Sequence, residues 1–157
     1  MNVYRISRLR WIDRREGSGV PGRWNYRYSK VLYTSSSISL ALLEILVHIQ
    51  PDQIPDDYHW IKGEIPDQLP IDTVGGLPED TAGYGTMWVN SARRAILAVP
   101  SVIVPEKNYL LNPAHEDFRS IRWLAPQKLV IDPRLTGIKP SLTLAAPLPE
   151  TSAVQGA

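Results

Sequence analysis

The 157-residue sequence contains no cysteine, which excludes a disulfide framework and metal sites built on thiolates. It also lacks an excess of charge, because 17 basic residues stand against 16 acidic ones and the formal net charge is +1. A balance this even gives no electrostatic reason to expect direct binding to nucleic acid. We therefore expect the partner to be a small molecule or a protein.

Long apolar runs are missing as well. No stretch reaches the roughly 18 consecutive apolar residues that a membrane-spanning helix requires. Residues 1–15 carry positive charge but no apolar segment typical of a secretory signal. With 43% hydrophobic and 21% charged residues, the composition is that of an ordinary folded domain. These features predict a cytoplasmic protein that does not enter a membrane.

Short strand patterns surround a single strong helical pattern. Strands are predicted at 3–9, 31–34, 58–65, 96–99, 102–104 and 109–111, with weaker candidates at 119–123 and 129–131. Residues 66–85 are rich in Pro, Gly and Asp, which predicts a long loop, and a short helix capped by Thr86 is expected at 86–92. The mixture predicts an α+β fold.

The chain is expected to form one domain, which we place at residues 1–134. After Arg134 the sequence loses its periodicity and gathers Pro, Ala, Ser and Thr. Residues 135–157 are therefore predicted to form a flexible tail.

The strong helical pattern is the segment 38–49, ISLALLEILVHI, preceded by three serines that could cap it. It is apolar on nearly every side, which predicts a helix that is buried on most sides. A single carboxylate, Glu44, lies in its middle. An isolated buried charge is costly, so Glu44 must be hydrogen-bonded or paired with a cation. This requirement makes Glu44 the first candidate for a functional residue.

Arg23 is the candidate cation. It lies in the segment GRWN at 22–25, where a neighbouring glycine and an aromatic residue suggest a backbone held close to a ligand. A guanidinium can grip a carboxylate or a phosphate with two parallel hydrogen bonds. A solvated loop arginine is the alternative interpretation.

Two further side chains flank the helix. Tyr33 ends a predicted strand and could stack on a base or a nicotinamide, or could be a core residue whose hydroxyl is satisfied. His48 follows Glu44 by one helical turn, but His59 and His115 stand in separate segments. A structural histidine is therefore expected, and no metal site.

Ser101 and Asn112 are polar residues near the ends of predicted strands. No Gly-x-Ser-x-Gly elbow surrounds Ser101, which argues against a hydrolase nucleophile. Asn112 precedes Pro113, and its side chain either caps the turn or contacts a ligand, with the turn role favoured in isolation.

The start of the chain is rich in arginine. These residues could meet an acidic partner, although a solvated face is the favoured interpretation of their alternation along a strand. They are Arg5, Arg8, Arg10, Arg14 and Arg15.

Three separated segments together resemble a known family. The series GRWN, VLYTSSSISLALLEILVH and AVPSVIVPEKNYLLNPAH resembles the RES domain of the toxins in RES and Xre-type toxin-antitoxin pairs, over residues 4–134. The name-giving Arg, Glu and Ser then fall on Arg23, Glu44 and Ser101, and an accompanying tyrosine falls on Tyr33. A glycine that the family usually has after the Arg-Trp-Asn segment is replaced here by the run YRYS at 26–29, which could alter the loop.

The resemblance implies an ADP-ribosyltransferase-like fold, in which small β-sheets with flanking helices form a cleft for NAD. It implies an enzyme that depletes NAD by cleaving the bond between nicotinamide and ribose, or that transfers ADP-ribose to a protein. A third hypothesis is a catalytically silent binding module in which Arg23 and Glu44 form a structural ion pair. The acceptor of the ADP-ribose (water, phosphate or a protein side chain) stays open.

The resemblance also implies roles for the matched residues. Glu44 would stabilise positive charge on the ribose, and Arg23 would hold the pyrophosphate. Ser101 would orient the nicotinamide or its ribose, while Tyr33 would offer a stacking surface. Trp24, beside Arg23, and Asn112 complete the set of predicted NAD contacts.

The expected partner is a small helix-turn-helix antitoxin of the Xre type, which would bind DNA itself and cover the NAD cleft. Contact with DNA would then be delegated to the antitoxin, in agreement with the even charge balance. A homodimer of the toxin within that complex is a further expectation.

Overall fold

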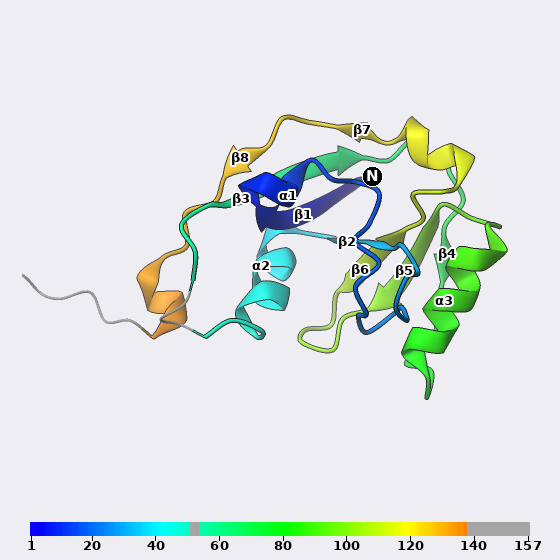
Figure 1. Ribbon diagram of the computed structural model, residues 1–157, viewed down its shortest axis with the longest axis horizontal. Coiled ribbons are helices and arrows are strands. Elements are labelled where there is room, and N and C mark those ends of the chain that lie inside the picture. The colour runs from blue at the N-terminus through cyan, green and yellow to red at the C-terminus, as the bar shows by residue number, and fades with distance from the viewer. Residues whose placement is uncertain (51–53, 138–157) are drawn as a thin grey trace, which may run out of the picture.

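All strands of the computed structural model, which describes residues 1–50 and 54–137, lie in one twisted sheet (Figure 1). The strand order is β4-β5-β6-β2-β1-β3-β7, and β8 pairs with β3. Only the β4–β5 pair is parallel. The strands are β1 (Asn2–Arg8), β2 (Leu32–Ser35), β3 (Tyr58–Glu64), β4 (Asp72–Thr73), β5 (Ile96–Pro100), β6 (Lys107–Leu111), β7 (Arg122–Trp123) and β8 (Gln127–Lys128).

Three α-helices and two described 3-10 helices accompany the sheet. They are α1 (Leu9–Ile12), α2 (Ile38–Leu46), α3 (Thr81–Ser91), η2 (Glu116–Ser120) and η3 (Pro133–Thr136). In Figure 1, α2 and α3 lie on opposite sides of the molecule, and the loop that connects α1 to β2 runs between them. The predicted α+β class is thereby confirmed.

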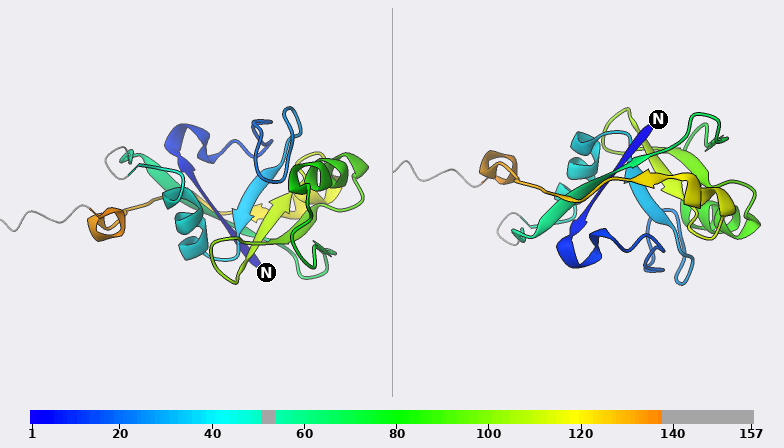
Figure 2. Two further views of the ribbon diagram at one scale, coloured as in Figure 1. Left: turned by 90° about the horizontal axis from the view of Figure 1, so that it is seen from below. Right: turned by 90° about the horizontal axis from the view of Figure 1, so that it is seen from above.

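The sheet is narrowest where β1 meets β2. β1 and β3 pair along their whole length, from Asn2 opposite Glu64 to Arg8 opposite Tyr58. By contrast, the pairing of β1 with β2 has one register pair, Tyr4 with Ser35. This joint divides the sheet into a β1 half (β1, β3, β7, β8) and a β2 half (β2, β4, β5, β6), which Figure 2 shows from two further directions. The small sheets expected from the resemblance are thus two parts of one sheet.

The buried core lies on both faces of β5 and β6. Ile96 and Leu111 are register partners and contribute to one cluster with Val3 of β1. Their neighbours Leu97 and Leu110 are also partners and contribute to a second cluster. Successive strand residues point to opposite faces, so the apolar run of β5 serves both clusters. The second cluster includes Trp24, Val31, Trp88 and Val89, which attaches α3 and the loop before β2 to the sheet.

Helix α2 is less buried than its sequence predicts. The Oγ of Ser37 caps it by accepting a hydrogen bond from the backbone N–H of Leu40 at 3.1 Å. The helix contacts β1 and β2, at the joint of the two half-sheets. Only Leu40 and Ala41 are fully buried, and Val47 directly after the helix is 57% exposed. The expected burial on most sides is wrong, because a single helix over the narrow joint has partners on one flank only.

Helix α3 (Thr81–Ser91) begins inside the loop predicted at 66–85 and takes up its last five residues. It begins at Thr81, five residues before the expected start, and its N-cap is Asp80, whose Oδ1 accepts from Gly83 N at 2.8 Å. Gly83 and Gly85 lower the intrinsic helix propensity of the segment, so the first turns of α3 could not be predicted from the sequence pattern. Strand β4 also lies inside the predicted loop.

Three smaller predictions change in the structure. Residues 102–104 form no strand, because they lie in the loop between β5 and β6. The last strand is β8, slightly before the predicted 129–131. In the predicted tail, residues 135–137 belong to the end of η3, and residues 138–157 lie outside the described part of the chain.

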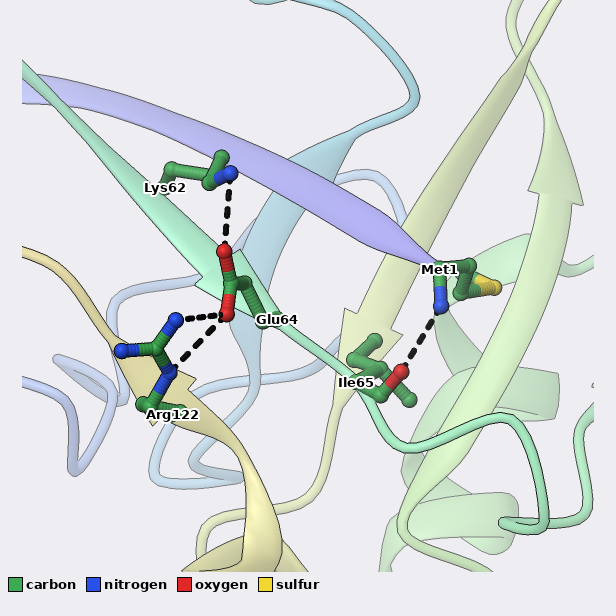
Figure 3. Close-up of polar contacts among 5 residues, drawn as sticks. All are labelled: Met1, Lys62, Glu64, Ile65 and Arg122. Carbon is green, nitrogen blue, oxygen red and sulfur yellow. Dashed lines mark hydrogen bonds and ion pairs between the residues drawn. The ribbon is translucent and has the colours of Figure 1, made fainter.

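An ion-pair cluster joins β3 to β7 at the rim of the β1 half (Figure 3). The carboxylate of Glu64 accepts from Arg122 Nε at 2.9 Å and lies 2.8 Å from Lys62 Nζ. Nearby, the amino group of Met1 donates to the carbonyl of Ile65 at 2.7 Å. These contacts fix the short strand β7 to the longer β3.

Candidate active site

The carboxylate of Glu44 is held by two side chains from the β2 half. Its Oε1 accepts a hydrogen bond from Ser101 Oγ at 2.9 Å and another from Asn108 Nδ2 at 2.6 Å. Its Oε2 accepts no hydrogen bond from any residue that the structure describes. The side chain is half-buried. One oxygen of the acid is therefore fixed by the protein, and the other is available to a ligand.

Ser101 opens the loop that leads from β5 to β6. Its backbone N–H donates to the carbonyl of Glu106 at 2.9 Å, which closes the loop. Its Oγ accepts from the N–H of Ile103 at 3.1 Å while donating its proton to Glu44. The serine proton is thus committed to the carboxylate. This arrangement suits a residue that positions Glu44, and it agrees with the expectation that Ser101 is not a hydrolase nucleophile.

Asn108, on β6, is the site residue that the sequence analysis missed. Its Oδ1 accepts from Ser35 Oγ at 2.7 Å, which leaves its Nδ2 pointing at Glu44. The amide therefore has a defined orientation set by its neighbours. A polar residue directly before the apolar run at 109–111 was the available signal, but such residues are common at strand ends and indicate no role alone.

Two more serines tie the β5–β6 loop to the start of α2. Ser36 Oγ and Ser37 Oγ both donate to Glu106 Oε2, at 2.9 and 3.2 Å. The N–H of Ser36 also donates to the carbonyl of Lys107 at 3.1 Å. The serine run before α2 thus has two uses, capping the helix and fixing the loop that supplies Ser101.

Arg23 does not pair directly with Glu44. Its side chain is exposed and forms no hydrogen bond or ion pair with any residue in the described part of the chain. The two residues instead line the same cavity of about 310 Å³, together with Gly22, Trp24, Tyr33, His48 and Val102. Arg23 was only a candidate partner for Glu44, and among the described residues the two side chains do not touch. The hypothesis of a silent module with a structural Arg23–Glu44 pair therefore loses its basis. The cavity that both residues line has room for a ligand that contacts both.

Tyr33 locks the loop that carries Arg23. Its hydroxyl donates to Asn25 Oδ1 at 2.7 Å and accepts from the N–H of Trp24 at 3.0 Å. Burial raises the pKa of Tyr33, although the Trp24 hydrogen bond and the charge of Arg23 act in the opposite direction. The phenol therefore stays protonated and keeps donating to Asn25. Its ring borders the cavity beside Glu44.

Helix α3 supports the same loop from the other side. Thr81 Oγ1 donates to the carbonyl of Arg23 at 2.7 Å, and the N–H of Tyr26 donates to Thr86 Oγ1 at 2.9 Å. A Cβ at Gly85 would lie 2.0 Å from the carbonyl oxygen of Trp24, so only glycine allows this approach. The position of Arg23 thus depends on α3.

The structure places the other two predicted NAD contacts in packing roles. Trp24 is 2% exposed, and its ring lies in the core edge-on to Tyr84, although the residue also borders the cavity of Arg23. Asn112 is fully buried, and its amide donates to the carbonyl of Val89 and accepts from the N–H of Ala114. The turn role therefore accounts for Asn112, which has no exposed surface to offer a ligand.

A second small cavity, of about 140 Å³, also borders Glu44. Tyr33, Glu44 and Asn108 border it together with Arg5 and Ile6 of β1. Glu44 therefore lines two hollows, and the exposed residue Arg23 lines one of them. His48 borders the larger hollow and is exposed, so it is not the structural histidine that was expected.

The described residues, 1–50 and 54–137, hold neither a cluster of metal-ligand side chains nor a membrane-spanning helix. No group of three His, Asp or Glu side chains in this part of the chain is placed to hold a metal ion. No helix in this part is both long and apolar enough to cross a membrane.

The element order defines an α+β protein with one mixed sheet, in which Glu44 of α2 is held by Ser101 and Asn108. The overall fold is similar to a chain in the crystal structure of the M. tuberculosis MbcT-MbcA toxin-antitoxin complex. The TM-score is 0.63, the identity is 16%, and the match covers 87% of this chain and 86% of that one. At this identity the likeness establishes the fold alone.

The sequence comparisons identify the family. The profile described as RES domain matches residues 2–132, so the chain belongs to the RES domain family. A Sphingobium sp. protein named Prs ADP-ribosylating toxin is 38% identical across 73% of this chain and 80% of its own length. A Yersinia enterocolitica protein named Toxin Res is 36% identical across 86% of this chain and 99% of its own length. A second Toxin Res, from Photorhabdus laumondii, is 33% identical across 88% of this chain.

Proposed function

We propose that this chain is the toxin of a toxin-antitoxin pair and that it consumes NAD by breaking the bond between nicotinamide and ribose. The observation that carries the proposal is the half-fixed carboxylate of Glu44, whose Oε1 is held by Ser101 and Asn108. Its other oxygen is free for a ligand in the cavity that Arg23 and Tyr33 also line. The toxin names of the relatives support the biological role.

The chemistry requires a fixed negative charge beside the ribose. When the C1′–N bond breaks, the electron pair leaves with nicotinamide and the ribose becomes oxocarbenium-like. Glu44 Oε2 would stabilise this charge or accept a hydrogen bond from a ribose hydroxyl. An acceptor then forms a new bond to C1′ and loses its proton. Holding Oε1 with two donors keeps the acid from reorienting during the reaction.

Arg23 would bind the pyrophosphate across the cavity from Glu44. Its exposed guanidinium has no competing partner within the described residues, and a charge-assisted contact with phosphate oxygens would give it one. Tyr33 would act through the loop, because its hydroxyl is used by Trp24 and Asn25 while its ring faces the cavity. Ser101 would position Glu44 and would not itself contact nicotinamide.

The test is nicotinamide release from NAD by the purified chain, followed by chromatography. Glu44→Gln keeps an oxygen that can accept from Ser101 and Asn108, so the fold should survive while release falls about 100-fold or more. Glu79→Gln, on an exposed acid outside the cavities, is the matched control and should release nicotinamide at the wild-type rate. Equal release by the wild type and Glu44→Gln would refute the assignment.

Transfer of ADP-ribose to a protein is the second candidate, because one relative is named an ADP-ribosylating toxin. The bond that breaks is the same, and a protein side chain replaces water or phosphate as the acceptor. NAD labelled on its adenine distinguishes the two cases in a cell extract. Label retained on a protein band supports transfer, and NAD consumption without a labelled protein supports depletion.

The partner would be an Xre-type helix-turn-helix antitoxin that covers the cavities beside Glu44. We propose a cytoplasmic location for this pair, as the sequence predicts. The protein encoded next to this chain should co-purify with it and suppress nicotinamide release, and its failure to do either would count against the pairing. A homodimer within the complex stays a prediction.

A further inference from the structure

A larger hollow, which shares Tyr33 with the candidate active site, lies along the start of the chain. Its volume is about 740 Å³, and it lies between β1, the loop after α1 and the beginning of β2. We call it the basic groove, defined by Arg5, Trp11, Arg14, Glu16, Lys30 and Tyr33. Nothing in the function proposed above uses this space.

Positive charge exceeds negative charge among the groove residues. Arg5, Arg14 and Lys30 stand against one carboxylate, Glu16. Arg14 and Lys30 form no side-chain hydrogen bond or ion pair with any described residue. The guanidinium of Arg14 lies over the ring of Trp11, 4.5 Å from its centroid, which holds the cation at the groove without neutralising it.

Other arginines of the same segment are engaged elsewhere. Arg8 pairs with Asp57 at 2.6 Å, and Arg15 pairs with Asp13 at 3.3 Å. The cations that line the groove are therefore a selected part of the arginine-rich start, whose purpose the sequence left open. A solvated face with paired charges accounts for Arg8 and Arg15 but not for Arg14.

The wall of the groove depends on a close backbone approach. Gly17, with φ of 71°, lines the groove, and a Cβ there would lie 3.0 Å from both the N and the O of Val31. The left-handed conformation and the lack of a side chain let the loop lie against the beginning of β2. The groove is thus a built feature of this loop.

The groove shares lining residues with both hollows beside Glu44. Tyr33 borders all three, while Arg5 and Ile6 border both the groove and the 140 Å³ cavity that Glu44 shares. A ligand whose reacting end lies at Glu44 can therefore extend past Tyr33 and Arg5 into the groove. The two small cavities suit a nicotinamide and its ribose, and the groove has the volume of ligand pockets, which is about 300–1,000 Å³.

We propose that the basic groove binds the adenosine-phosphate half of NAD, with Arg14 and Lys30 on the phosphate oxygens and Trp11 beside the base. This inference rests on the proposed function, because it assumes that the nicotinamide half lies at Glu44. Free cations suit phosphate, and an aromatic ring at a half-exposed site suits a base. Arg23 would then hold the pyrophosphate from the opposite side of Tyr33.

Arg10 supplies a matched control for Arg14. Its guanidinium also lies over the ring of Trp11, 5.2 Å from the centroid, but Arg10 does not line the groove. Arg14→Gln and Arg10→Gln remove the same charge from the same aromatic ring. Only the first removes it from the groove, and neither breaks a hydrogen bond within the described residues, so both variants should keep the wild-type melting temperature.

The binding test uses calorimetry with the full chain and three ligands: ADP, nicotinamide mononucleotide and inorganic phosphate. ADP should bind the wild type and Arg10→Gln, and it should bind Arg14→Gln about tenfold more weakly. Nicotinamide mononucleotide should bind all three proteins equally. Equal ADP binding by the two variants would overturn the proposal, and so would inorganic phosphate that binds as tightly as ADP, since the groove would then be a simple anion site.

Turnover gives a second readout. Arg14→Gln should raise KM for NAD about tenfold and leave kcat within about twofold, because ground-state and transition-state binding are lost together. A fall in kcat with unchanged KM would overturn the proposal. ADP binding requires no turnover, so a chain that binds ADP through Arg14 but releases no nicotinamide would refute the proposed function and keep the groove. If the wild type releases nicotinamide but Arg14→Gln changes neither ADP binding nor KM, the groove proposal is refuted and the proposed function is kept.

Discussion

The side-chain amide of Asn108 donates to Glu44 Oε1 at 2.6 Å, so the orientation of the acid on α2 is set from strand β6. The same amide accepts from Ser35 Oγ at 2.7 Å, which prevents it from turning over. A carboxylate held in this way presents its second oxygen in a fixed direction. Catalysis at Glu44 should therefore depend on residues that never touch a substrate.

Asn108→Ala should lower kcat for NAD consumption about 10- to 100-fold, because a hydrogen bond to a charged group contributes about 1.5–3 kcal/mol. Asn108→Asp keeps the volume and loses the donor, so it should be equally impaired. The measurement is nicotinamide release, with Glu79→Gln, an exposed residue outside the cavities, as the control that keeps the Asn108–Glu44 contact. Full activity of Asn108→Asp would show that the donor has no role.

Ser101→Ala should also lower kcat about tenfold, since it removes the second donor to Glu44 Oε1. The effect should be absent in a Glu44→Gln background, because the serine acts through the acid. A double-mutant cycle on nicotinamide release measures this coupling. If Ser101→Ala costs the same factor in both backgrounds, the serine contacts the substrate independently of Glu44.

Tyr33→Phe should raise KM for NAD more than it lowers kcat. The change keeps the ring beside the cavity but leaves Asn25 Oδ1 and the N–H of Trp24 without their partner, which loosens the loop that carries Arg23. An unsatisfied buried polar group costs about 1–3 kcal/mol, so the urea midpoint should fall as well. An unchanged midpoint and an unchanged KM would contradict the role given to this hydroxyl.

Gly85→Ala should destabilise the protein by about 1–3 kcal/mol, as expected for overpacking, although alanine favours helices. The added methyl would meet the carbonyl of Trp24 at 2.0 Å. Gly76→Ala is the matched control, because no atom lies within 4 Å of its added Cβ. Chemical unfolding should separate the two variants, and equal stability would mean that α3 does not support the Arg23 loop.

Stability should fall in acid partly through Glu64. Its hydrogen bonds with Lys62 and then Arg122 hold the pKa of Glu64 below its usual value of 4.5. The native state then binds fewer protons than the unfolded state, so the contribution is present above pH 4.5 and is lost as the pH falls through the lowered pKa. Urea midpoints of the wild type and Glu64→Gln, measured against pH, should differ at neutral pH and converge in acid. A constant difference at every pH would contradict this linkage.

The sequence predicted those parts of the site that depend on local pattern. The helix with Glu44, its serine cap and the strands around it follow from periodicity and from side chains within a few residues. Glu44 was also correctly expected to need polar partners. The sequence did not predict Ser101 and Asn108 as those partners, because they lie 57 and 64 residues after Glu44 and reach it through the sheet in which β6 pairs with β2.

Helix α3 shows why other parts could not be predicted. Its glycines look like loop residues until the carbonyl of Trp24 is placed against Gly85. For α2 the error was the reverse. Its apolar residues predicted burial on most sides, but no described neighbour covers its exposed flank. In both cases the deciding contact, or its lack, lies between elements that are distant in sequence.

Because β1 and β2 share the single register pair of Tyr4 with Ser35, the angle between the two halves of the sheet can vary among related proteins. The donors to Glu44 belong to the β2 half, whereas Arg5 of the groove belongs to the β1 half. A small change of angle at this joint would alter the spacing between acid and groove without replacing any residue in either. Natural variants and distant substitutions in β3 or β7 should therefore be able to retune turnover, and selection on this chain would act on the shape of the sheet as well as on the residues in the cleft.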